Sequence, residues 1–311
     1  MIKEDRFHGF DYLRVVAMLA VIYVHGCDTN DSVESLSKWL SFPVPCFLLM
    51  AAFLAQMSER GSSRNYLESL MRRVRRLIPP FLAWSAIYLI VRKLKATATG
   101  ESFDWNWAGS LFWGDAAHQL YFVPLLIYSF VLWLLPMQWS RTRPGWTLGL
   151  CAVAGLAAIA SENVINSSLP PNRYFIAKSL VWFPIGILAA LIVFRFEQIR
   201  RVALGPAFAG VIALSLMGFR NVYVLSIGLF VIGCCWTTPA PKWVQRLSAL
   251  SFGIYLGHVL IIETMQFGLA RIGLSLQSAA VTLGVIGGAA ALSVLLALTL
   301  DHFSKTKWLV R

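Results

Sequence analysis

Long apolar segments recur along the whole chain and constrain its fold more than any other feature of the sequence. Each is roughly 16 to 24 residues long, close to the length that a helix needs to cross the hydrocarbon core of a bilayer. The fifth, seventh and eighth are short, and the pair around Gly218 and Arg220 also fits one re-entrant element. We predict ten spans, at residues 11–28, 37–57, 75–94, 118–137, 146–161, 174–194, 202–218, 221–237, 251–270 and 277–300.

The composition supports a membrane protein and excludes an ordinary soluble one. Of the 311 residues, 58% are hydrophobic and only 14% are charged, which is far from the balance of a soluble globular domain. The loops between the segments are short, so no soluble domain separates from the rest. We therefore expect one integral-membrane domain over residues 1–311, an all-α bundle that handles any substrate between its helices or at their mouths.

The basic residues set the expected orientation, because lysine and arginine are retained on the cytoplasmic side during insertion. With a cytoplasmic N-terminus, 18 lysines and arginines lie in inside segments and 7 in outside segments. Both termini are then cytoplasmic. This bias explains the net charge of +12 without a nucleic-acid partner, although a basic inner face also attracts anionic lipid or an anionic cofactor.

The first apolar segment carries three ionisable side chains, Asp11, Arg14 and His25. A cleavable signal peptide would not carry them, so we expect this segment to be retained. Arg14 and His25 are eleven residues apart, which places them on nearly the same face of a helix and roughly 16 Å apart along its axis. Asp11 lies one turn before Arg14. Ionisable residues in lipid normally face a partner or a wet cavity, so this polar stripe is the main functional candidate.

Two structural explanations of the stripe stay open. Asp11 and Arg14 can form an interfacial ion pair that fixes the tilt of the helix, and His25 can be a buried neutral histidine bonded to a neighbouring helix. A histidine aligned with that pair also suits proton transfer, because the pKa of an imidazole lies near neutral pH. The five cysteines show no metal-binding spacing, so we expect no metal.

Five motifs follow one another in the order in which one family of membrane enzymes carries them. They are DYLR with the Arg14-x10-His25 spacing, VPCFLLMAAFL (44–54), RRVRRLIPPFLAW (72–84), AHQLYFVPLLIY (117–128) and LSFGIYLGHVLIIE (250–263). Together they resemble the acyltransferase-3 family, bacterial membrane enzymes that O-acylate surface polysaccharides and related acceptors. The second motif departs from the family's pattern, because Ala51 and Ala52 stand where the family has Ser-Gly. Any role of that serine is absent here.

The resemblance implies an acetyltransferase that uses cytoplasmic acetyl-CoA as its co-substrate. The acceptor would be a hydroxyl of a cell-surface polysaccharide or of its lipid-linked precursor, and the enzyme would span the bacterial inner membrane several times. The compact length looks most like short members such as the enterobacterial common antigen O-acetyltransferase. The expected partners are therefore a coenzyme A thioester, a glycan acceptor and membrane lipid.

The catalytic roles follow from what this transfer needs. We expect His25 to be the general base for the hydroxyl, or to carry the acetyl group transiently. Arg14 would orient the donor or stabilise charge near the thioester, and Asp11 would hold Arg14. The phosphates of coenzyme A suit planar guanidinium groups, which a cluster just before Pro79 supplies: Arg72, Arg73, Arg75 and Arg76. These arginines can alternatively serve only to enforce the topology.

Further residues are candidates for substrate binding or support: His118, Tyr121, Tyr255, His258, Glu263, Trp105 and Trp107. Tyr255 and His258 share a helix face, and His258 can relay a proton or bond a neighbouring helix. Glu263, about 140° further round the helix, needs a partner, and we favour a polar cavity for it. The tryptophans Trp105 and Trp107, with Trp113, can stack on a sugar ring or form an aromatic belt.

Three rival functions remain. A secondary transporter or a flippase of a lipid-linked glycan would also have about ten helices and buried charges. A membrane sensor in which the polar stripe is structural is the second, and transfer of another acyl group such as succinyl is the third. The sequence leaves open the acceptor, the side of the membrane where the acceptor binds, and the oligomeric state.

Overall fold

The computed structural model is helical throughout the part of the chain that it describes. It describes residues 6–27, 36–37, 39–60, 66–168, 175–195, 206, 209–210, 213 and 222–310, and it contains no strand among them. The helices are α1 (His8–Cys27), η1 (Trp39–Ser41), α3 (Pro43–Arg60), α4 (Tyr66–Thr99), α5 (Trp107–Phe112), η2 (His118–Tyr121), α6 (Phe122–Leu132), α7 (Leu134–Thr142), α8 (Pro144–Ser168), α9 (Phe175–Arg195), α12 (Val222–Cys235), α13 (Lys242–Arg271), α14 (Ala279–His302) and η3 (Lys307–Leu309).

Several of these helices are long and apolar enough to cross a membrane, which confirms the expected class of fold. Five single helices in the described part of the chain have the length and hydropathy of a membrane span: His8–Cys27, Trp39–Ser58, Tyr66–Thr99, Lys242–Arg271 and Ala279–His302. A bent pair, His118–Leu132 with Leu134–Ser140, makes a sixth if it is one span. Shorter apolar helices occur at Pro144–Ala157, Val181–Val193 and Val224–Cys235. The predicted span at residues 202–218 lies almost wholly outside the described residues.

The fourth predicted span is not one straight helix. It divides at Trp133, whose φ of −94° and ψ of 8° are not helical, and the two parts are bent by 47°. Pro136 follows in the first turn of α7, where its missing N–H breaks no intrahelical hydrogen bond. The break is therefore compatible with either a broken span or a re-entrant loop.

Helix α4 extends well beyond the predicted span at residues 75–94. It begins at Tyr66, so the arginine cluster lies inside the helix rather than in the loop before it. Pro79 and Pro80 also lie inside α4. Because proline has no N–H, these two residues cannot donate to the carbonyls four residues earlier, at Arg75 and Arg76.

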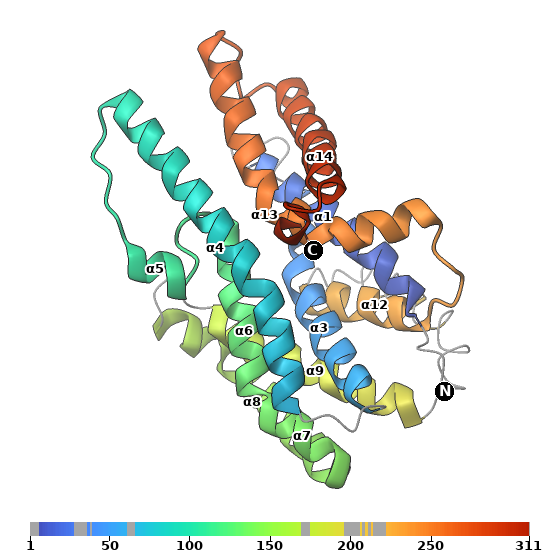
Figure 1. Ribbon diagram of the computed structural model, residues 1–311. Coiled ribbons are helices and arrows are strands. Elements are labelled where there is room, and N and C mark those ends of the chain that lie inside the picture. The colour runs from blue at the N-terminus through green and yellow to red at the C-terminus, as the bar shows by residue number, and fades with distance from the viewer. Residues whose placement is uncertain are drawn as a thin grey trace. The chain divides into compact units, whose positions relative to one another are not determined.

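The chain forms two compact units, and the first comprises Met1–Cys46 with Gln198–Arg311. In it α1 packs against α12, α13 and α14, and α13 packs against α14, as the blue, orange and red helices of Figure 1 show. An apolar core joins α1, α13, α14 and the C-terminal segment. Its buried members are Met18, Ile22, Leu250, Ile254, Ile262, Val285, Ala289, Ala297 and Val310.

A glycine contact brings α1 and α12 close together. A Cβ on Gly9 would overlap the carbonyl oxygen of Gly233 and would lie 2.7 Å from the Cβ of Trp236. Beside it the ring of Phe10 stacks on Phe230, with centroids 5.6 Å apart. Small residues let membrane helices approach through their backbones. Gly9 therefore fixes where the first turns of α1 meet the end of α12.

The second unit comprises Phe47–Glu197. In it α6 packs against α4 and α9, and α8 packs against α7 and α9. Helices α3 and α9 meet at Gly186, where a Cβ would lie only 2.5 Å from the carbonyl oxygen of Leu49. A buried polar contact joins α3 to α7, since Nε2 of Gln56 donates to Oγ of Ser140 over 2.6 Å.

Candidate functional site

The polar stripe of α1 faces α13 at both of its ends. Near the start of α1, the hydroxyl of Ser248 donates to Oδ1 of Asp11 over 2.7 Å. Near its end, the ring of His25 lies beside the ring of His258. Ser248 precedes His258 on α13, as their partners Asp11 and His25 do on α1. The two helices therefore run parallel. The prediction that Asp11 and His25 share a helix face is confirmed by this common neighbour.

Asp11 is held by Arg6 and not, as we expected, by Arg14. Nε of Arg6 lies 2.8 Å from Oδ2 of Asp11, and Nη2 lies 3.2 Å from Oδ1. The carboxylate is buried, whereas 49% of the Arg6 side chain is exposed. Helical side chains lean toward the N-terminus of their helix, so Asp11 reaches back toward Arg6, while its charge still acts on Arg14. The ion pair that the sequence suggests therefore forms with the other arginine.

Arg14 is left without a hydrogen bond or ion pair to any described residue. Its side chain is partly buried in α1. A charged side chain in an apolar helix is costly unless it meets a partner or a wet cavity. The Arg14 guanidinium is thus able to bind an anionic group of a ligand.

His25 and His258 form a histidine pair, with ring centroids 5.2 Å apart and ring planes at 44°. His258 is fully buried, and its Nδ1 lies 2.6 Å from the carbonyl oxygen of Tyr255. A carbonyl can only accept, so Nδ1 carries the hydrogen and Nε2 carries the lone pair. Nε2 is buried and has no hydrogen-bond partner within the described parts of the chain.

Sequence reasoning placed Tyr255 and His258 on one face but did not pair His258 with His25. A signal for the pair is nevertheless present. His25 stands 17 residues after the start of α1 and His258 stands 16 residues after the start of α13, so two parallel helices bring the two rings to a similar depth. Arg6 and Ser248, the partners of Asp11, were also missed.

The other candidates on α13 differ in their surroundings. Tyr255 is buried, and its ring centroid lies 5.7 Å from that of His258. Glu263 is exposed on α13, and the polar cavity that we expected for it stays a prediction. Its position five residues after His258 turns it about 140° away from the histidine pair.

The arginine cluster occupies the first turns of α4, and its four members differ in their contacts. Nη2 of Arg73 donates to Oγ of Ser58 over 2.6 Å, and its guanidinium lies 5.6 Å from the ring centroid of Phe130. Arg72 donates to Oγ of Ser69 over 2.8 Å. Arg75 and Arg76 are exposed. Within the cluster, therefore, Arg72 and Arg73 are anchored to neighbouring serines, and Arg72, Arg75 and Arg76 are exposed at the surface.

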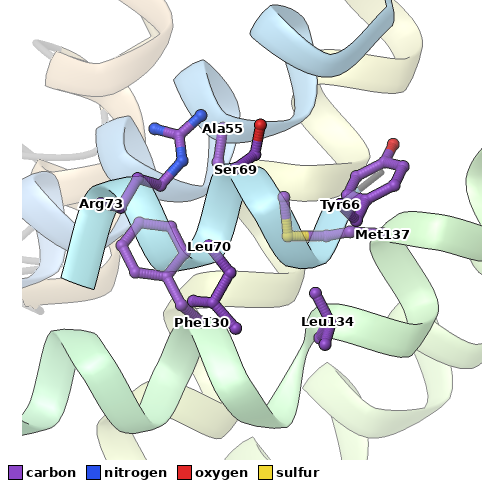
Figure 2. Close-up of a pocket in the computed structure, with 8 residues that line it drawn as sticks. All are labelled: Ala55, Tyr66, Ser69, Leu70, Arg73, Phe130, Leu134 and Met137. Atoms are coloured by element: carbon purple, nitrogen blue, oxygen red, sulfur yellow. The ribbon is translucent and has the colours of Figure 1, made fainter. Parts of the chain in front are cut away.

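A small pocket adjoins the cluster, lined by Ala55, Tyr66, Ser69, Leu70, Arg73, Phe130, Leu134 and Met137. Figure 2 shows the polar ends of Arg73, Ser69 and Tyr66 on one side of it and Phe130 and Leu134 on the other. Its internal volume of about 10 Å³ is close to that of a single water-sized sphere. A nucleotide therefore cannot enter the pocket as it stands, and an anion at this place would bind to the outer surface of α4.

An aromatic cluster stands between α4 and α5. The rings of Trp105 and Trp107 stack 4.9 Å apart, Phe103 meets Trp105 edge-on, and Nζ of Lys93 lies 5.2 Å from the Trp105 ring. Trp107 remains 57% exposed. Trp113, expected in the same cluster, contacts Tyr128 with centroids 6.0 Å apart.

The two remaining candidates lie on η2. His118 is exposed and Tyr121 is partly buried. Both belong to the second unit, as do the arginine and aromatic clusters, whereas Asp11, Arg14, His25, Tyr255 and His258 belong to the first. Within the first unit, the polar stripe meets Ser248 and His258 of α13. Within the second unit, the arginines lie near the start of α4.

The family is established by comparison with known families. A model of the acyltransferase domain called Acyl_transf_3 matches residues 7–299 of the chain. No curated protein and no solved structure matches it. The match runs from the residue before α1 into the last turn of α14 and covers every candidate residue described above. This chain belongs to the acyltransferase-3 family of membrane acyltransferases.

Proposed function

We propose that the protein transfers an acetyl group from acetyl-CoA to a hydroxyl of a cell-surface polysaccharide or of its lipid-linked precursor, with His25 as the general base. The observation that carries this proposal is the polar face of α1. It presents His25 beside a buried histidine. Arg14 lies on the same face and makes no hydrogen bond or short ion pair with a described residue. A base and a cation on one stripe suit acyl transfer from an anionic donor.

The reaction needs one proton acceptor that later returns its proton. A nitrogen of His25 takes the proton of the acceptor hydroxyl while the hydroxyl oxygen attacks the thioester carbonyl carbon. The tetrahedral intermediate then collapses, the C–S bond breaks, and the imidazolium returns the proton to the leaving thiolate. The products are the acetyl ester and free coenzyme A. In the acyl-enzyme variant, a nitrogen of His25 first attacks the carbonyl and releases the thiol, and the hydroxyl then attacks the acetylimidazole.

Spacing assigns Arg14 to the donor rather than to the reacting carbonyl. Eleven residues of helix place the Cα atoms of Arg14 and His25 roughly 16 Å apart along the axis, and the Arg14 side chain leans away from His25 toward the N-terminus. The two side chains therefore do not meet the same carbonyl oxygen. We assign Arg14 to an anionic or strongly polar part of the coenzyme A donor, away from the reacting carbonyl.

The arginines of α4 are the proposed phosphate ligands. Arg75 and Arg76 are exposed, and planar guanidinium forks pair with phosphate oxygens through two parallel hydrogen bonds. Arg73, tied to Ser58 and stacked on Phe130, would hold this surface in shape. The same cluster also supports a cytoplasmic start for α4, since arginine is retained on that side.

The parallel run of α1 and α13 supports the ten-span topology with both termini in the cytoplasm. Parallel helices start on the same side, so an even number of crossings separates their starts. From α1 to α12, the apolar helices described count seven if the bent pair is one span. An eighth crossing at residues 202–218 makes the number even. This topology agrees with residence in the bacterial inner membrane and with cytoplasmic acetyl-CoA.

The aromatic cluster is the proposed contact for the acceptor glycan. Trp107 is stacked on Trp105 on one side and is 57% exposed, so an outer ring face is available to the C–H face of a sugar. The neighbouring side chains of Lys93, Asp104 and Asn106 are polar and offer hydrogen bonds to hydroxyls. In the proposed topology this cluster lies outside, where a surface polysaccharide or its precursor is presented.

A second function, transport of a lipid-linked glycan, is favoured by one observation. The pair His118–Leu132 and Leu134–Ser140 is bent by 47°, and transporters often build their sites from broken helices. Transport would not consume acetyl-CoA. Transfer of another acyl group, such as succinyl, would keep the same roles for His25 and Arg14.

The two functions are separated by supplying labelled donor to purified protein. The protein is reconstituted in vesicles with the glycolipid and polysaccharide fractions of bacterial membranes, and radiolabelled acetyl-CoA or succinyl-CoA is added. The proposal predicts ester-linked label in the glycan fraction, released by mild base, from acetyl-CoA in preference to succinyl-CoA. Movement of glycolipid between leaflets without any labelled ester would instead favour the transporter.

A further inference from the structure

His258 presents a buried nitrogen, Nε2, that no described residue bonds. Its Nδ1–H is engaged by the carbonyl of Tyr255 at 2.6 Å, which fixes the tautomer and leaves a lone pair on Nε2. The side chain is fully buried, and no described residue donates to Nε2. Buried polar atoms are normally hydrogen-bonded, so an unsatisfied one is a sign of a functional role.

The neighbouring ring is at the distance that a hydrogen bond requires. When an N–H of one imidazole points at a nitrogen of another about 3 Å away, the ring centroids lie about 5 Å apart. The centroids of His25 and His258 are 5.2 Å apart, with ring planes at 44°. This centroid distance matches the spacing of two imidazoles joined by an N–H···N hydrogen bond.

We infer that His258 is the positioning partner of His25 in catalysis. In the reacting complex Nε2 of His258 accepts the N–H of His25, so the second nitrogen of His25 carries its lone pair toward the acceptor hydroxyl. When His25 takes the proton of the hydroxyl, the N–H bonded to His258 becomes that of an imidazolium and its hydrogen bond strengthens. His258 itself gains and loses no proton. This inference rests on the proposed role of His25 as the general base.

The surroundings favour this arrangement over a carboxylate partner for His25. The carboxylate on the stripe, Asp11, is engaged by Arg6 and Ser248, and it lies fourteen residues before His25. Glu263 is exposed on another face of α13. Nε2 of His258 is thus a buried acceptor without a described partner, on a ring that lies beside His25.

The test compares two substitutions of His258 that keep its bulk. His258→Gln places an amide oxygen near the position of Nε2, so it still accepts from His25, whereas His258→Phe fills the space without an acceptor. We expect His258→Phe to lower kcat at least about tenfold with the KM for acetyl-CoA unchanged within about twofold, because general-base catalysis contributes about 10²- to 10⁴-fold. His258→Gln is expected to retain several times the kcat of the phenylalanine variant.

A double variant separates a positioning role from a structural one. If His258 acts through His25, adding His258→Phe to His25→Ala lowers the rate no further than His25→Ala alone. A further loss of the same factor would overturn the inference. Equal rates for the Phe and Gln variants, or a phenylalanine variant with wild-type kcat, would also overturn it.

The experiment keeps failure of this inference apart from failure of the proposed function. Each variant is first shown to be folded by its melting temperature in detergent and by stabilisation with acetyl-CoA. If His25→Ala is inactive while His258→Phe is fully active, only the inference about His258 fails. If His25→Ala transfers acetyl groups as fast as the wild type, the proposed base itself is wrong.

Discussion

Ser248 on α13 donates a 2.7 Å hydrogen bond to Asp11 on α1, across 237 residues of sequence. The carboxylate that receives it is buried and also meets the guanidinium of Arg6. Together with the contact between His25 and His258, this bond fixes the register in which α1 and α13 lie side by side. The histidine pair therefore depends on a polar contact formed about four turns away along α1.

Ser248→Ala is predicted to destabilise the protein, because it takes a hydrogen bond from a buried carboxylate. Such a loss costs about 1–3 kcal/mol, which lowers the melting temperature by a few degrees. Ser251→Ala is the matched control on the same helix, since its hydroxyl is bonded to the backbone carbonyl of Ser248. Calorimetry in detergent compares the two. Equal melting temperatures would show that the Asp11 contact does not stabilise the fold.

Gly9→Ala is predicted to disturb the contact between α1 and α12. The new methyl group would overlap the carbonyl oxygen of Gly233, and overpacking of this kind costs about 1–3 kcal/mol. Gly284→Ala on α14 provides the control, because a Cβ there meets no atom within 4 Å and alanine is the better helix former. The yield of folded protein and its melting temperature should fall for Gly9→Ala alone. A stable Gly9→Ala variant would contradict the close approach.

Removal of Arg75 and Arg76 together is predicted to weaken binding of acetyl-CoA without unfolding the protein. Both side chains are exposed, so little packing is lost, whereas each charge-assisted bond to phosphate is worth about 1.5–3 kcal/mol. We expect the Kd to rise at least about tenfold and to depend less on salt. Calorimetric titration with acetyl-CoA and with dephospho-coenzyme A measures both effects.

The matched control for this change removes two exposed lysines, Lys305 and Lys307, which the same topology places on the cytoplasmic side. Their loss lowers the net charge equally but leaves the α4 cluster intact. Acetyl-CoA should bind this variant as tightly as the wild type. If both double variants lose affinity alike, general charge attraction and not the arginine cluster would explain the binding.

The ten-span topology is tested by labelling single engineered cysteines in intact cells. The native cysteines are all buried, so they give little background with a membrane-impermeant maleimide. A cysteine at Ser275, between α13 and α14, should be labelled from outside, and one at Lys305 should be labelled only after the cells are opened. The reverse pattern would overturn the orientation of both helices.

Much of the fold followed from the apolar segments, because the length of a membrane span and the polarity of its flanks are local properties. The ends of the helices in the structure differ from those of the predicted spans where the local sequence fits more than one conformation. Helix α4 continues outward from its apolar part through an arginine-rich stretch that helices tolerate well, and Trp133 breaks the fourth span without a proline at that position. Neither feature changes the hydropathy pattern on which the prediction rested.

The sequence predicted only which residues of one helix share a face, and not which residues of other helices they contact. The periodicity of α1 placed Asp11 and His25 on one face, and α13 confirms this. Periodicity cannot say which side chain of another helix fills that face, so the pairing of Asp11 with Ser248 and of His25 with His258 came from the structure. The pairing of Asp11 with Arg6 instead of Arg14 depends on the lean of helical side chains and on a residue outside the helix.

The role of His25 is tested most directly by the rate of acetyl transfer in the His25→Ala variant. The measurement uses radiolabelled acetyl-CoA with the glycolipid and polysaccharide fractions of bacterial membranes, alongside stabilisation by acetyl-CoA as proof of folding and donor binding. We predict a loss of transfer of at least about 10²-fold, with donor binding retained. A folded His25→Ala variant that binds acetyl-CoA and transfers the label at the wild-type rate would contradict the assignment of His25 as the base.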